Sequence, residues 1–268
     1  MRFFKMKSIS KGFGHLGHKA LNFFIYIGGV FSLFVGTIVQ VFIPPFRSKE
    51  LFVHMYKIGV LSLPIVLLVS LFTGMVLALQ SAYQLTKMNA QIYISSLVAL
   101  SVVRELGPVL TALVVAGRVG ASITAELGTM KVTEQIDALQ TLAANPVKYL
   151  VVPRFLALCL MLPLLTVYAD LIGIIGGYII GVYKLLIGPT IYIEMTFDPL
   201  AFKDVFTGIF KSFIFAIIIC IVSCYEGFRA EGGAEGVGKA TTLSVVTSFI
   251  LIIAADCLFT ALFYFAFP

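Results

Sequence analysis

Charged side chains are scarce in this sequence. Only 12% of its 268 residues are Asp, Glu, Lys or Arg, whereas 60% are hydrophobic. A soluble domain has about 25% charged and about 45–50% apolar residues, so this chain has too few polar side chains to cover a surface in water. The composition excludes a soluble globular protein and a disordered chain, and it indicates a membrane protein.

Metal-ligand and disulfide patterns are also missing. The sequence has three histidines, none spaced with carboxylates as metal ligands are, and four cysteines without a CxxC or Cys/His pattern. All four cysteines lie in or beside apolar segments, where a cysteine acts as a small hydrophobic residue. We therefore expect no metal site and no disulfide framework.

Long uncharged runs predict the membrane-spanning elements. A spanning helix needs about 20 mainly apolar residues, whereas the strands of a membrane barrel alternate with period two over about 10 residues. The apolar runs here are continuous and longer than that. We predict an all-α polytopic membrane protein, a single domain over residues 1–268, with five spanning helices at about 58–82, 91–117, 155–181, 205–225 and 240–264.

A sixth apolar stretch, residues 20–46, could span, re-enter or lie flat on the membrane. Basic loops stay in the cytoplasm, and 14 of the 19 Lys and Arg residues lie in the N-terminal tail and in segments 47–57, 118–154 and 226–239. These four segments share one side only if 20–46 does not cross. We therefore predict that residues 1–46 form an N-terminal interfacial segment, with the N-terminus inside and, after five crossings, the C-terminus outside.

Residues 233–239 (GAEGVGK) nearly match a phosphate-binding P-loop. A P-loop needs Ser or Thr after the lysine because that hydroxyl binds Mg²⁺, and Ala240 stands there. No strand pattern precedes the segment. We predict that this chain does not hydrolyse ATP and that the segment is a glycine-rich cytoplasmic turn.

Residues 129–146 predict a short amphipathic helix between the second and third spans. Val132, Ile136 and Leu139 share one face by their i, i+4, i+7 spacing, and Asn145-Pro146 ends the helix. The other face carries Glu134, Gln135, Asp137 and Gln140. Helices that rest on membranes favour Lys and Arg on the polar face, so this acidic helix fits a protein partner better.

Five ionisable residues interrupt the predicted spans: Arg104, Glu105, Asp170, Lys211 and Asp256. A charge at the centre of a spanning helix costs roughly 2.5–3.5 kcal/mol on insertion scales, so each is a candidate functional residue. Adjacent residues on a helix point in different directions, so Arg104 and Glu105 need separate partners. Lys211 and Asp256 lie at similar depths, about 9 and about 12 Å, and can form a buried ion pair with either a structural or a transport role.

Several stretches of the sequence resemble the MlaE family of ABC-transporter permeases. The resemblance runs from about residue 50 to the end of the chain. It rests on LSVVRELGPV at 100–109, AGR at 116–118, AELGTM at 125–130, TEQIDAL at 133–139, Pro153-Arg154 and GGAEGVGKATT at 232–242.

The resemblance implies a permease and not an enzyme. Permeases of this family are homodimers, each subunit with five spanning helices and an interfacial helix, in the inner membrane. They pair with a cytoplasmic ABC ATPase, which binds the ATP, and with a periplasmic MCE-domain protein, and they move phospholipids between membranes. The resemblance therefore implies no cofactor of the permease itself, no nucleic-acid partner and a periplasmic C-terminus.

Two sets of site residues follow from the resemblance. The 131–142 helix would be the coupling helix that docks on the ATPase, through Glu134, Gln135, Ile136, Asp137 and Leu139. The substrate cavity would be lined by Arg104, Glu105, Lys211 and Asp256.

Two other functions remain open at this point. A proton-coupled secondary transporter could use Glu105 and Asp256 as a proton relay, and it would need neither an acidic coupling helix nor an ATPase. A passive scaffold for an envelope complex would leave the charges within the spans without a use.

Overall fold

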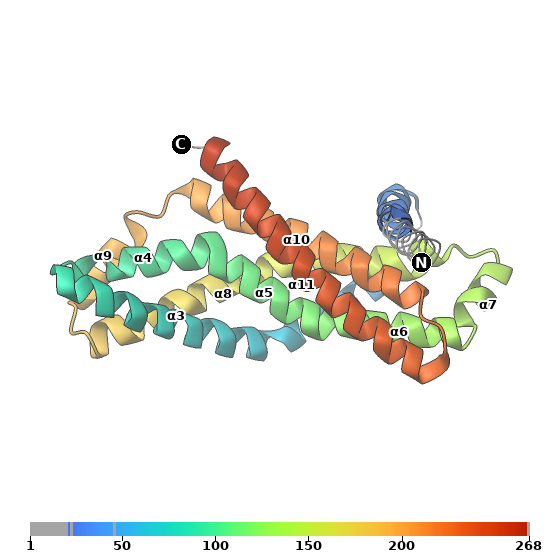
Figure 1. The fold of residues 1–268 in the computed structure, drawn as a ribbon, viewed down its shortest axis with the longest axis horizontal. Helices are drawn as coiled ribbons and strands as arrows, with labels where there is room; N and C mark the ends of the chain where they lie inside the picture. Colours follow the sequence, from blue (N-terminus) through green and yellow to red (C-terminus); the bar gives the residue numbers. More distant parts are fainter. Residues whose placement is uncertain (1–20, 22–23, 45–46, 267–268) are drawn as a thin grey trace, which may run out of the picture.

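The structure, a computed structural model, describes residues 21, 24–44 and 47–266 and is helical throughout, with no strand among these residues (Figure 1). Six of its helices are long and apolar enough to cross a membrane, and five of them cover the predicted spans. The prediction of an all-α polytopic membrane protein is therefore confirmed. The basic residues of the N-terminal tail and two of the three histidines, His15 and His18, lie outside the described residues.

Most of the observed helices are longer than the predicted spans because they continue into polar residues beyond the apolar runs. Two π-helical turns, η4 and η5, join α-helices end to end, and a third, η6, leads into α8. In chain order the elements are α2 (Ser48–Ile58), η1 (Val60–Ser62), α3 (Leu63–Leu85), η2 (Thr86–Met88), η3 (Gln91–Tyr93), α4 (Ile94–Ser101), η4 (Val102–Leu106), α5 (Gly107–Val115), η5 (Ala116–Gly120), α6 (Ala121–Val132), α7 (Gln135–Thr141), η6 (Val147–Val151), α8 (Val152–Tyr183), α9 (Pro189–Phe197), α10 (Phe202–Phe228) and α11 (Gly233–Ala266).

The long helices run back and forth along one axis. Figure 1 shows α7 and the connection from α10 to α11 at one end of the bundle, and α9 with the start of α4 at the other. Segments 47–57 and 118–154 meet at the α7 end, where Lys57 Nζ lies 3.5 Å from Glu126 Oε1. The three basic segments within the described residues, 47–57, 118–154 and 226–239, therefore share one end of the bundle.

The N-terminal helix, Phe24–Val41, runs across the bundle. Near its start the rings of Tyr26 and Tyr225 lie 5.2 Å apart, and beyond its end Lys148 Nζ donates a hydrogen bond of 2.7 Å to the Pro44 carbonyl. Tyr225 and Lys148 both lie toward the α7 end. Figure 1 views this helix nearly down its axis, whereas α3 and α8 lie along the horizontal. The helix is long enough to span, but its direction favours the predicted interfacial placement.

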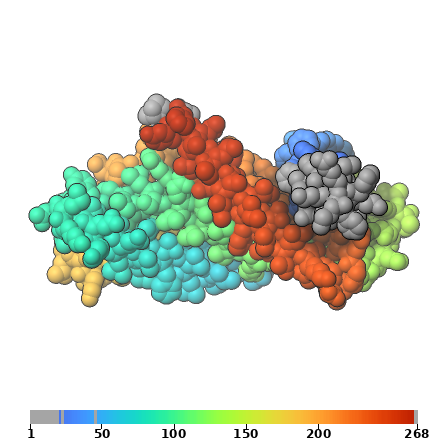
Figure 2. Space-filling view, viewed as in Figure 1, coloured from blue at the N-terminus to red at the C-terminus, as the bar shows by residue number. Residues whose placement is uncertain are grey.

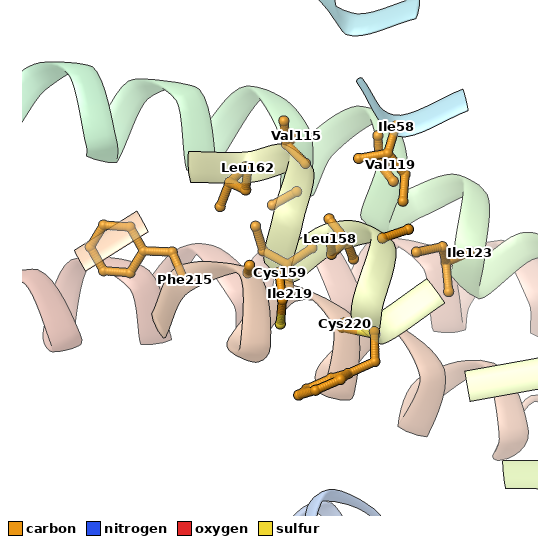
Figure 3. Packing of buried hydrophobic residues seen from close by; sticks show 14 of the residues in the cluster. Ile58, Val115, Val119, Ile123, Leu158, Cys159, Leu162, Phe215, Ile219 and Cys220 are labelled. Carbon is orange, nitrogen blue, oxygen red and sulfur yellow. The ribbon is translucent and has the colours of Figure 1, made fainter. Parts of the chain in front are cut away.

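The apolar core joins α2, α5, α6, α8 and α10. Figure 3 shows members of this core cluster, among them Ile58, Val115, Leu158, Phe215 and Ile219, each at most 2% exposed. Three of the four cysteines are buried free thiols, as predicted, and Cys257 is an exposed one.

Helices α3 and α8 touch backbone to backbone. A Cβ on Gly74 would overlap the carbonyl oxygen of Gly173, so these two glycines allow the close packing of α3 on α8 within the subunit. By contrast, α11 lies on the outside (Figure 2), and only 11% of its apolar stretch is buried.

Candidate functional site

A fully buried lysine joins three helices. Lys211 of α10 has no solvent exposure, and its Nζ lies 2.6 Å from Glu105 Oε2 and 2.9 Å from Asp256 Oδ1. The predicted Lys211–Asp256 ion pair is confirmed, although it lacks hydrogen-bond geometry. Glu105 is a second and closer partner. One ammonium group therefore balances two carboxylates, one from η4 and one from α11.

The remaining contacts of Lys211 complete the cluster. Its Nζ donates to Thr260 Oγ1 at 2.7 Å and to the Arg104 carbonyl at 3.2 Å. In an α-helix that carbonyl would accept from the N–H of residue 108, and Pro108 has none. The helix is distorted just before Gly107-Pro108, where it forms the π-helical turn η4, and such turns occur often at functional sites.

Arg104 has a partner of its own, as predicted. Its Nη2 and Nε lie 2.6 and 2.8 Å from Asp204 Oδ1, and Asp204 Oδ2 accepts from the Ala201 N–H at the start of α10. The Asp204 side chain is 4% exposed, whereas that of Arg104 is 46% exposed. Sequence reasoning missed Asp204 because it lies one residue before the predicted span. An acidic residue is favourable in the first turn of a helix, so Asp204 itself indicated that the helix begins before the apolar run.

The two ion-pair groups border one cavity of about 150 Å³, the Arg104 cavity. That volume suits a small polar ligand. Asp256 lies behind Lys211 and is not a lining residue. The lining residues are Arg104, Glu105, Lys203, Asp204, Thr207, Lys211, Thr260, Phe263 and Tyr264. The positive charges of Arg104 and Lys211 are nearly balanced by the carboxylates they contact. The guanidinium of Arg104 is nevertheless exposed enough to bind an anion.

The predicted coupling helix is shorter than 131–142. Lys131 and Val132 belong to α6, the chain turns at Thr133–Glu134, and α7 begins at Gln135. Glu134 has a φ of 60°, a left-handed conformation that costs a non-glycine residue about 1–2 kcal/mol. The single amphipathic helix was therefore a wrong prediction, because side-chain periodicity cannot reveal this backbone break.

Side chains of α7 divide into buried and exposed sets. Ile136 is 4% exposed and belongs to the core, while Leu139 is partly buried, so the part of these two side chains in ATPase docking stays a prediction. Glu134, Gln135 and Asp137 are exposed, and Asp137 accepts from Lys131 Nζ at 3.0 Å. Leu142, just beyond the helix, is 78% exposed and was missed.

Comparison with known proteins identifies the family. The permease MlaE family matches residues 51–262. The chain belongs to the MlaE permease family. A probable ABC transporter permease protein of Rickettsia prowazekii is 46% identical over 93% of this chain and 97% of its own length. A probable ABC transporter permease protein of Synechocystis is 44% identical over 76% of this chain and 77% of its own. The intermembrane phospholipid transport system permease protein MlaE of Haemophilus influenzae is 35% identical over 93% of this chain and 96% of its own.

Membership in the MlaE permease family fixes the general role. The chain is the transmembrane permease of an ABC transporter, a multi-pass inner-membrane protein, and ATP hydrolysis is carried out by a partner ATPase. Consistent with this, residues 233–239 are helical and open α11, with Lys239 paired to Glu235 at 2.7 Å. The prediction of a turn there is wrong, because the backbone bends one residue earlier, at Gly232. Within the described residues no group of His, Cys, Asp or Glu could hold a metal ion.

Proposed function

We propose that this permease moves phospholipids between the membranes of the cell envelope, as a homodimer coupled to its ATPase and to a periplasmic MCE-domain protein. The observation that carries the proposal is the Arg104 cavity, where a half-exposed guanidinium lies beside aromatic side chains and a buried charge cluster. The name of the Haemophilus relative supports a phospholipid as the cargo. The permease needs no cofactor of its own.

Arg104 is the proposed headgroup contact. Guanidinium binds phosphate oxygens strongly and stays charged when buried. Its contacts to Asp204 use Nε and Nη2, so Nη1 remains for a ligand. Glu105, Lys211 and Asp256 fix the shape and charge of the cavity wall behind it. A cavity of about 150 Å³ holds no acyl chains, so the chains would lie between subunits, along exposed apolar faces such as that of α11.

The geometry favours this function over a proton relay. Glu105 and Asp256 both contact the one buried ammonium group of Lys211, at 2.6 and 2.9 Å. Each carboxylate is therefore part of a buried ion-pair cluster and has no separate path of its own along the span.

Removing the guanidinium tests the cargo. Arg104→Ala is expected to lower the phospholipid bound per purified complex at least about tenfold, because a charge-assisted hydrogen bond contributes about 1.5–3 kcal/mol. Arg104→Lys, which keeps a charge near Asp204, should be intermediate. Mass spectrometry of extracted lipid measures the effect, with Lys184→Ala as the control at an exposed site. Unchanged lipid in Arg104→Ala would leave Arg104 a purely structural role.

The proposed topology has a direct labelling test. Cys257→Ser removes the one exposed thiol and leaves three buried ones in place. In that background a cysteine inserted after Phe267 should react with an impermeant thiol reagent from the periplasmic side, and Gln140→Cys in α7 only after the membrane is opened. Labelling of the first site from the cytoplasm alone would contradict the five-span topology.

A further inference from the structure

A second charged hollow lies toward the α7 end of the bundle, away from the Arg104 cavity. Two adjoining cavities of about 330 and about 790 Å³ share His54, Lys57 and Glu126 and lie between α2 and α6. We call them together the α2–α6 hollow. Nothing in the coupling or cargo roles above uses these residues.

Basic side chains outnumber acidic ones in the α2–α6 hollow. Its ionised lining residues are Lys49, Lys57, Arg118 and Arg154 against Glu50 and Glu126. Both acids already have basic partners, Glu50 in Arg47 and Glu126 in Arg154 and Lys57. Arg118 instead donates to neutral oxygens, Ser62 Oγ at 2.7 Å and the Lys57 carbonyl at 3.3 Å. The hollow therefore has positive charge in excess, which attracts an anion.

One buried arginine in the hollow is incompletely satisfied. The Arg154 side chain is 7% exposed, with Nη2 at 2.9 Å from Glu126 Oε2 and Nη1 donating to the Leu150 carbonyl at 2.6 Å. Its Nε has no acceptor among the described residues. A buried N–H without an acceptor is costly, so this wall of the hollow is polar and suited to an oxygen-bearing ligand.

An apolar stripe leads from the hollow along α3. Leu61 lines the smaller cavity and is 45% exposed, and Ile65 and Leu68 follow at 42% and 52%. Ile65 and Leu68 share one face of α3 by their i, i+3 spacing, and Leu61 precedes them in η1. Phe72 and Val76 extend the face, at 57% and 58% exposed. Charge at one end and an exposed apolar face beyond it match the two parts of a lipid.

We propose that the α2–α6 hollow binds the phosphate headgroup of an anionic phospholipid from the cytoplasmic leaflet, with its acyl chains along the α3 stripe. The site is distinct from the cargo site, and it would remain whatever cargo the transporter carries. Lys49 and Lys57 are exposed and attract the headgroup, and Arg118 and Arg154 line the wall behind them.

Paired lysine replacements test the site without disturbing the core. The full chain with its ATPase is purified in detergent, and binding of phosphatidylglycerol, phosphatidylcholine and inorganic phosphate is measured by native mass spectrometry. Lys49→Gln/Lys57→Gln should weaken phosphatidylglycerol binding about tenfold, since each basic group near the surface contributes to anionic lipid binding. The matched control Lys184→Gln/Lys239→Gln removes the same charge elsewhere and should bind as the wild type does.

Each other outcome overturns part of the proposal. Equal phosphatidylglycerol binding by the wild type, the Lys49→Gln/Lys57→Gln variant and the control would show that the hollow does not bind this lipid. Loss of inorganic phosphate binding in the lysine variant, with phosphatidylglycerol unaffected, would assign the hollow to a free phosphate. Loss of the ATPase from the variant complex, with lipid retained, would make it a protein contact. None of these results bears on whether the transporter moves phospholipid, which a transfer assay decides separately.

Discussion

Lys211→Met is expected to destabilise the permease and to abolish ATP-driven transport. Methionine fits the volume but leaves Glu105 and Asp256 without their shared cation. Breaking a buried ion pair in this way costs about 3–5 kcal/mol, and the lower end applies here because the Glu105 side chain is 37% exposed. Thermal unfolding in detergent should show a lowered midpoint, and lipid transfer should fall more than tenfold.

A triple variant that removes every charge of the Lys211 cluster distinguishes a role in folding from a role in transport. Lys211→Met combined with Glu105→Gln and Asp256→Asn removes all three charges together, so no carboxylate stays unpaired and stability should largely recover. Transport should not recover if the charges shape the cargo site. Recovery of both would show that the cluster acts only in folding, and failure of Lys211→Met to change either would contradict its place in the site.

Glu134→Lys/Asp137→Lys is expected to release the ATPase. Both side chains are exposed, and Asp137→Lys also sets a second cation beside Lys131, which lies 3.0 Å from Asp137 Oδ1. Charge reversal at an interface turns attraction into repulsion that costs several kcal/mol. Co-purified ATPase should therefore drop more than tenfold while the permease stays folded.

The matched control for this docking variant reverses two charges at the other end of the bundle. Glu194 and Asp198 are exposed in and just after α9, and Glu194→Lys/Asp198→Lys should retain the ATPase. Normal co-purification with the α7 variant would show that α7 is not the docking element. Ile136→Ala is a different experiment, because it removes a core side chain and should loosen α7 from the bundle.

Much of the fold was predictable because membranes impose strong constraints on sequence. Uncharged runs predicted five long helices that the structure contains, and depth alone paired Lys211 with Asp256. The interfacial placement of the N-terminal helix, which rests on the distribution of basic residues, stays a prediction. The resemblance, rather than periodicity, brought Arg104 and Glu105 into the same site as that pair.

The remainder depends on geometry that spacing does not carry. Asp204 was missed because helix α10 begins earlier than its apolar run. The α2–α6 hollow was missed because it joins residues 49–61 to residues 118–154 across the fold. The break at Glu134 depends on one left-handed backbone angle, and it turns Ile136 inward. The spacing of apolar residues places them on one helical face only where the helix is continuous, and here it is interrupted at Glu134.

Transfer of phospholipid by the reconstituted complex tests the central claim most directly. The permease, its ATPase and the MCE-domain protein are placed in vesicles, and movement of labelled phospholipid to or from acceptor vesicles is followed with ATP, without ATP and with a proton gradient alone. We expect transfer with ATP only, and none with Lys211→Met. ATP hydrolysis without phospholipid movement, or transfer driven by the proton gradient without ATP, would contradict the proposed function.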